Sequence, residues 1–166
     1  PAGVPRPVTR SGAKPGDGLY VPGAPGGSFG RDGLGRHLTF EPRVHEAIEL
    51  RRTLGERLHA MIDLSDGVAR DAKHLARASD VRLEIDAGRL PRSPGCDWRS
   101  ALGDGEDYEL LFAAEAPVPE SIRGVTITRI GTVTACEHVS GDGIADADDV
   151  IVRLDGRIVD LAGLGW

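Results

Sequence analysis

The chain has 166 residues, of which 40% are hydrophobic and 28% are charged, and its formal net charge is −6. These values are typical of one globular domain with a proper core. They argue against a nucleic-acid partner, which requires a basic surface, although metal ions allow an acidic protein to bind phosphates. No stretch is long and apolar enough to span a membrane, so no membrane association is expected. Cys96 and Cys136 match no metal-ligand spacing, and we expect free thiols in a reducing cytoplasm.

The first 36 residues are rich in glycine and proline. One strand is predicted there, over 19–21, directly after the turn sequence PGDG. The remainder is predicted to be loop, with a disordered linker as the alternative; glycines after a strand also allow the backbone to approach a phosphate. An amphipathic pattern then predicts a helix over 43–58, which Gly55 ends.

The next segments mix strand and helix periodicities. A short apolar strand leads into a turn and a helix over 67–78, and Ser65 or Asp66 is placed to cap that helix. A loop is expected over 88–98, and an Asp-Gly pair indicates a late hairpin. The predicted strands are 60–64, 81–85, 108–113, 125–133, 150–154 and 157–161. This order predicts an α/β (α+β) layered domain with a mixed β-sheet and packed helices.

A first acidic cluster lies in the sequence MIDLSDG and just after it. Asp63 is expected to end a strand, Asp66 to open a helix, and Asp71 to lie about one turn further on. The helix start offers backbone N–H groups to a phosphate, Ser65 adds a hydroxyl, and carboxylates hold Mg²⁺. The alternative is structural, because Ser and Asp are common helix caps and Asp favours the first helical turn.

A second acidic cluster, Glu106, Asp107 and Glu109, directly precedes the apolar run Leu110–Phe112. One interpretation is a solvated turn before a strand. The other is a carboxylate that recognises a cationic or hydrogen-bond-donating substrate.

Three further features carry weaker signals. Arg10 lies in a glycine-rich loop, where it is either solvent-exposed or a phosphate clamp. The five histidines have no paired zinc spacing, and His74 is expected at the surface or the core edge of its helix. The run 142–149 (DGIADADD) lacks the ligand order of an EF-hand and is interpreted as a solvated acidic loop.

Taken together, these segments resemble thiamine-monophosphate kinase, a family in the superfamily of aminoimidazole ribonucleotide synthetase and selenophosphate synthetase. MIDLSDG is moderately specific within that superfamily, whereas its combination with GEDYELLF and TRIG is highly specific to this kinase. The matching stretches follow the family's order to about Val133: VTRSGAKPGDGLYV (8–21), RHLTFEPRV (36–44), MIDLSDGVARDAKHLARAS (61–79), IDAGRLP (85–91), GDGEDYELLF (103–112) and TRIGTV (128–133).

The resemblance implies ATP- and Mg²⁺-dependent phosphorylation of thiamine phosphate to thiamine diphosphate. It implies that Asp63 and Asp66 are Mg²⁺ ligands, with Asp66 also catalytic, and that Arg10 and Ser65 bind ATP. Glu106 is implied to bind the thiamine moiety. Family members end in an aromatic-containing segment that packs on the substrate; the resemblance implies that Trp166 is a shifted equivalent, and a frayed terminus is the alternative.

The family's full chain is considerably longer, and this chain begins with Pro1 rather than Met. We therefore expect a processed or truncated product, with 1–18 connecting to a missing N-terminal domain and 19–166 forming the C-terminal kinase domain. Alone, it is expected to be an incomplete catalyst, and a homodimer only when that other domain is present. Two alternatives stay open: another synthetase of the same superfamily, and a stand-alone domain that binds a nucleotide or a partner without catalysis.

Overall fold

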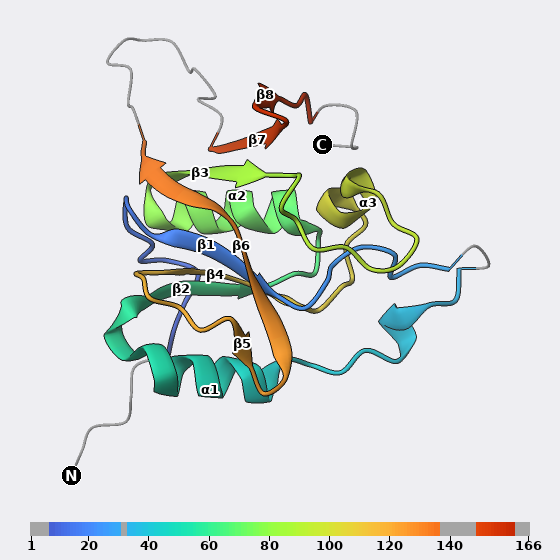
Figure 1. The fold of residues 1–166 in the computed structure, drawn as a ribbon, viewed down its shortest axis with the longest axis horizontal. Helices are drawn as coiled ribbons and strands as arrows, with labels where there is room; N and C mark the ends of the chain where they lie inside the picture. Colours follow the sequence, from blue (N-terminus) through green and yellow to red (C-terminus); the bar gives the residue numbers. More distant parts are fainter. Residues whose placement is uncertain (1–6, 31–32, 137–148, 162–166) are drawn as a thin grey trace.

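A mixed β-sheet is the framework onto which the helices pack (Figure 1). The structure, a computed structural model, describes residues 7–30, 33–136 and 149–161. Within those ranges there are eight strands: β1 (Gly18–Pro22), β2 (Leu58–Asp63), β3 (Val81–Asp86), β4 (Leu110–Ala114), β5 (Ser121–Ile122), β6 (Val125–Ala135), β7 (Val150–Leu154) and β8 (Arg157–Ile158). The helices are α1 (Val44–Leu54), α2 (Val68–Ser79) and α3 (Trp98–Gly103), with short 3-10 turns η1 (Arg36–Leu38) and η2 (Gly55–Arg57).

The strands are not arranged in chain order, because the sheet runs β2-β4-β1-β6-β3-β7-β8 and β5 adds to β6. β1 lies between β4 and β6, with Leu19 opposite both Ala113 and Gly131. The pairing of β3 with β7 is parallel, and the other strand pairs are antiparallel. The predicted mixed sheet is therefore confirmed.

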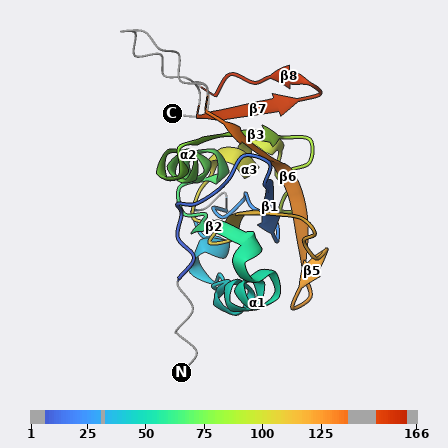
Figure 2. The ribbon, with the colours of Figure 1, turned by 90° about the vertical axis from the view of Figure 1, so that its left-hand side faces the viewer.

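Side chains that alternate along the central strands enter two separate cores. Leu19 and Val21 of β1 face the core that α2 and α3 cover, whereas Tyr20 faces the core beneath α1 and β5. Both faces of β1 and β4 are thus covered, and all five residues of each strand are buried. β3 has buried and half-buried residues in strict alternation, which is typical of one covered face. Figures 1 and 2 show α2 running along β3 and α1 lying near β2 and β5.

Most predicted elements are confirmed, with small shifts at their ends. Gly55 ends α1 as expected, and Asp155 and Gly156 form the turn between β7 and β8. The prediction missed β5 and α3; the first turn of α3 is capped by Asp97, whose side chain accepts hydrogen bonds from two backbone N–H groups. In α1 the buried positions are Leu50 and Leu54, while the apolar residues nearer its start are largely exposed.

Among the described residues, no helix is long and apolar enough to cross a membrane. Cys96 and Cys136 are both free thiols, as their separation in the sequence suggested.

Candidate functional site

A surface hollow of about 510 Å³ lies at the end of β2, where the chain turns into α2. It brings together four residues that the resemblance assigned to ATP and Mg²⁺: Arg10, Asp63, Ser65 and Asp66. The complete lining is Val8, Thr9, Arg10, Met61, Ile62, Asp63, Ser65, Asp66, Asp71, His74 and Leu110. The four assigned residues, up to 56 positions apart in the sequence, therefore lie around one site, as the hypothesis of a phosphate and metal site requires.

The strand-to-helix turn at this site is confirmed, but its capping differs from the prediction. Neither Ser65 nor Asp66 caps α2; the N-cap is Gly67, with no side-chain hydrogen bond. The carboxylate of Asp71, from the first helical turn, instead accepts a hydrogen bond from the backbone N–H of Asp66 at 2.9 Å. Gly67 has φ +99°, and a Cβ there would lie 2.9 Å from the carbonyl oxygen of Leu102. The turn therefore needs glycine to lie this close to α3.

Three carboxylates, those of Asp63, Asp66 and Asp71, line the hollow. Asp71 is only 2% exposed, and burial raises its pKa to about 6. The charges of Asp66 and Asp63 also act to raise that pKa, hydrogen bonds from the backbone N–H groups of Asp66 and Ser65 act to lower it, and the value of about 6 is the net result. The charges of Asp63 and Asp66 thus disfavour the ionised form of Asp71, and a cation among these carboxylates would relieve that repulsion.

The donor set also fits a divalent metal ion. Ligand atoms of Asp66, Asp71 and His74 all lie within 4.8 Å of one another. Mg²⁺ prefers oxygen ligands and retains several waters, so it suits the carboxylates better than the imidazole. His74 was not predicted as a site residue; its place one helical turn after Asp71 was the available signal, because residues three apart share a helix face.

Arg10 lies on the rim of the hollow, and its side chain is exposed. Within the described ranges, no carboxylate forms an ion pair with its guanidinium. Since exposed arginines commonly bind phosphate oxygens through a planar fork, this group is available to an anionic ligand. Both interpretations of Arg10, an exposed residue and a phosphate clamp, are compatible with this position.

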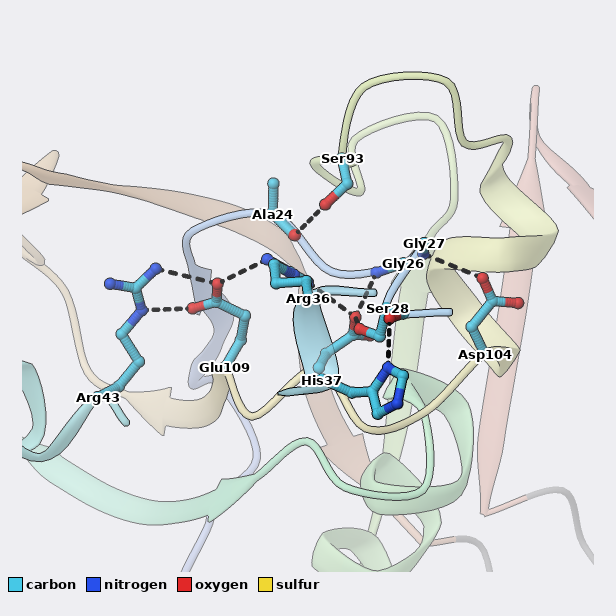
Figure 3. Close-up of polar contacts among 11 residues, drawn as sticks. Ala24, Gly26, Gly27, Ser28, Arg36, His37, Arg43, Ser93, Asp104 and Glu109 are labelled. Carbon is cyan, nitrogen blue, oxygen red and sulfur yellow. Dashed lines mark hydrogen bonds and ion pairs between the residues drawn. The ribbon is translucent and has the colours of Figure 1, made fainter. Parts of the chain in front are cut away.

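The second acidic cluster is not a solvated turn, because Asp107 and Glu109 are each only 3% exposed. Asp107 accepts hydrogen bonds from Ser28 at 2.5 Å and from Arg36 at 2.8 Å. Glu109 accepts bonds from Arg43 at 2.6 and 3.0 Å, and Figure 3 shows it between Arg43 and Arg36. These two carboxylates therefore hold the glycine-rich loop and the start of α1 against the sheet and are not free to bind a substrate.

Glu106 is the remaining acid of this cluster, and its side chain is half-buried. It has φ +51°, and its backbone N–H donates to the carbonyl oxygen of Ser65 at 2.7 Å. The cluster is thus joined through its backbone to the turn that carries Ser65, although Glu106 is not among the residues lining the hollow.

A smaller apolar hollow of about 350 Å³ continues from the first, and the two share Asp63 and Leu110. One of its walls is the stacked pair Phe40 and Tyr108, whose ring centroids lie 4.0 Å apart. This hollow has room for the planar ring of a ligand beside Phe40 and Tyr108, with a charged group of the same ligand reaching Asp63.

Two predicted features lie outside the described residues. Trp166 is one, and residues 142–148 of the acidic run are the other. The last residue of that run, Asp149, is described, and it pairs with Arg77 at 2.7 Å.

Comparison with known proteins identifies similarity to thiamine-monophosphate kinases. A thiamine-monophosphate kinase from Rhodopirellula baltica is 40% identical over 142 residues, which are 77% of this chain and 43% of the relative. The crystal structure of thiamine-monophosphate kinase from Stenotrophomonas maltophilia has a TM-score of 0.68 at 28% identity, over 92% of this chain and 54% of that one. AaThiL complexed with AMPPCP and TMP gives a TM-score of 0.59 at 28% identity, over 92% and 52%.

No family model matches the chain. The chain spans about half the length of the relatives that it matches. Over that shared half, in sequence and in fold alike, the chain belongs with the thiamine-monophosphate kinases.

Proposed function

We propose that the chain forms the C-terminal part of a thiamine-monophosphate kinase, which transfers a phosphoryl group from ATP to thiamine phosphate and so forms thiamine diphosphate. The observation that carries this proposal is the common hollow of Arg10, Asp63, Ser65 and Asp66. AaThiL, a protein of the same fold, was solved with AMPPCP and TMP, which supports a nucleotide and a phosphorylated small molecule as ligands. On this proposal, residues 1–18 connect to a further domain, and 19–166 form the C-terminal domain.

Transfer between two phosphates requires in-line positioning and neutralised charge more than covalent catalysis. Asp63 and Asp66 would hold Mg²⁺, and the buried Asp71 supports them by accepting the backbone N–H of Asp66. When bound, Mg²⁺ neutralises phosphate charge. Arg10 donates to phosphate oxygens from the rim, and the hydroxyl of Ser65 donates at the turn.

The first test is nucleotide binding by the chain itself. Calorimetric titration with AMPPCP is expected to give saturable binding that requires Mg²⁺. Asp66→Asn should weaken that binding at least about tenfold, because it removes a ligand charge from the metal site. The matched control is Glu120→Gln, which removes the same charge from an exposed position away from the hollow. No Mg²⁺-dependent binding by the wild-type chain would contradict the proposal.

The second test is turnover, which on this proposal needs the part of the family's length that the chain does not span. In a chimera with that part of a relative, release of ADP should depend on thiamine phosphate and should be abolished by Asp66→Asn. Glu106→Ala is expected to raise the KM for thiamine phosphate and to leave the KM for ATP unchanged. An unchanged KM for thiamine phosphate would remove Glu106 from the substrate site, and the same measurement on Trp166→Ala tests the terminal aromatic residue.

A module that binds a nucleotide without catalysis is the second candidate. The observation that favours it is the extent of the match, since the chain covers only 43–54% of the relatives compared above. AMPPCP binding by the chain together with no ADP release by any chimera would support this candidate over the kinase.

A further inference from the structure

The side-chain hydroxyl of Ser79, the last residue of α2, forms its hydrogen bonds with the segment that carries Arg10. Its hydroxyl oxygen accepts hydrogen bonds from the backbone N–H groups of Gly12 at 3.1 Å and Ala13 at 3.2 Å. The same hydroxyl donates to the carbonyl oxygen of Arg10 at 3.2 Å. One donor and two acceptor positions are all that a serine hydroxyl has, so its capacity is fully used.

This arrangement is unusual for a serine in the last turn of a helix. Such a hydroxyl commonly bonds back to a carbonyl of its own helix. Here it reaches residues 66–69 positions away in the sequence instead. Ala13 is itself buried, so its N–H has little access to water as a substitute partner.

The other flank of Arg10 is also fixed. The carbonyl oxygen of Thr9 accepts a hydrogen bond from the backbone N–H of Met61 at 2.9 Å, in β2. Arg10 is therefore held between β2, which ends at Asp63, and α2, whose first turn contains Asp71. The two elements that present the acidic side of the hollow thus also place its basic rim.

We propose that Ser79 is a positioning residue of the nucleotide site, which sets where the Arg10 guanidinium stands relative to the carboxylates at the opposite end of α2. This inference rests on the proposed function, because it takes Arg10 as a ligand of the nucleotide phosphates. Ser79 itself touches no ligand. Without its hydroxyl, the backbone from Arg10 to Ala13 loses three hydrogen bonds, and the guanidinium samples positions from which it no longer reaches a phosphate.

The test is a double-mutant cycle on the Mg²⁺-dependent affinity of the chain for AMPPCP. Ser79→Ala removes these three hydrogen bonds and should weaken binding about three- to tenfold, which is the size of one hydrogen bond made less well by Arg10 to the ligand. Ser79→Thr, which keeps the hydroxyl, should restore the affinity. Thr53→Ala, which removes an exposed hydroxyl from α1, is the control and should have no effect.

The decisive arm is Ser79→Ala in the background of Arg10→Ala. If Ser79 acts through Arg10, the double variant binds no more weakly than Arg10→Ala alone. Two results would overturn the inference and leave the proposed function intact. In the first, Arg10→Ala binds AMPPCP more weakly but Ser79→Ala binds it with wild-type affinity. In the second, both single variants bind more weakly and their losses add fully in the double variant. No binding by the wild-type chain would overturn both.

Amide hydrogen exchange keeps the result interpretable if Ser79→Ala lowers stability. Faster exchange confined to Gly12 and Ala13 supports a local clamp. Faster exchange throughout α2 and β2 would mean that Ser79 stabilises the fold as a whole, and that outcome also overturns the positioning role.

Discussion

Glu109→Gln is the sharpest test of the buried ion pairs that hold the glycine-rich loop. The substitution keeps the size of the side chain and removes its charge. It leaves Arg43, with 22% of its side chain exposed, without the carboxylate that it contacts at 2.6 and 3.0 Å. The same hydrogen-bonded contact raises the pKa of Arg43, which favours the charged form of the guanidinium.

The size of the effect follows from this burial. Removing one partner of a buried ion pair costs about 3–5 kcal/mol, because the other charge stays buried and uncompensated. Arg43 keeps some access to water and a hydrogen bond to the new amide oxygen. The expected loss in the free energy of unfolding is therefore at the lower end of that range, about 3 kcal/mol. For a chain of this size, that loss lowers Tm by roughly 6–12 °C.

Urea unfolding followed by circular dichroism measures the loss directly, provided that the slope of the transition is unchanged. Glu106→Gln is the matched control, since it is the same substitution three residues away and removes no described side-chain contact. It should change stability by less than about 0.5 kcal/mol. Equal stabilities of the two variants would refute the conclusion that the second acidic cluster is structural.

Three further substitutions test the sheet, the core and the loop beside α3. A Cβ at Gly131 would collide with the carbonyl oxygen of Glu84 on the neighbouring strand, so Gly131→Ala should cost about 1–3 kcal/mol and lower the urea midpoint. Phe112 is fully buried, and Phe112→Ala should cost about 3–5 kcal/mol by the same assay; a loss below about 1 kcal/mol would contradict its place in the core. Burial, and secondarily the charge of Asp104, raises the pKa of the Cys96 thiol. In a variant that lacks the other cysteine, the rate of Cys96 alkylation should therefore keep rising above pH 9. Asp104→Asn should speed that alkylation at pH 8, and an unchanged rate would argue against this cause.

Much of the fold could be predicted because its signals are local. The two-residue period of β3, the Asp-Gly turn and the change of period at Gly67 each depend on neighbours in the sequence. The same locality explains why the turn at MIDLSDG was predicted together with its carboxylates. The short helix α3 was missed, since six residues in a stretch with prolines give too weak a period.

Local sequence signals could not separate the buried, structural residues of the second acidic cluster from Glu106. Asp107 and Glu109 look as solvated as Glu106 in the sequence, and their partners Arg36 and Arg43 lie 66–73 positions away. The pairing of β4 with β1 and with β2, the strands before and after Arg36 and Arg43 in the sequence, brings those segments together. The side-chain cap predicted for α2 was wrong for a related reason. The backbone N–H of Asp66 donates to the carboxylate of Asp71, which lies about one helical turn further along the chain.

The central place of β1 has a consequence for how the protein is made. Its two neighbours, β4 and β6, are synthesised long after it. Leu19, for example, pairs with Ala113 of β4 on one side and with Gly131 of β6 on the other. Such distant pairings raise the contact order and slow folding. Until β4 has emerged, the nascent chain exposes both edges of β1, and one edge stays exposed until β6 follows. β1 therefore completes its pairing only after most of this chain has been synthesised, and this interval is when the chain is most exposed to aggregation.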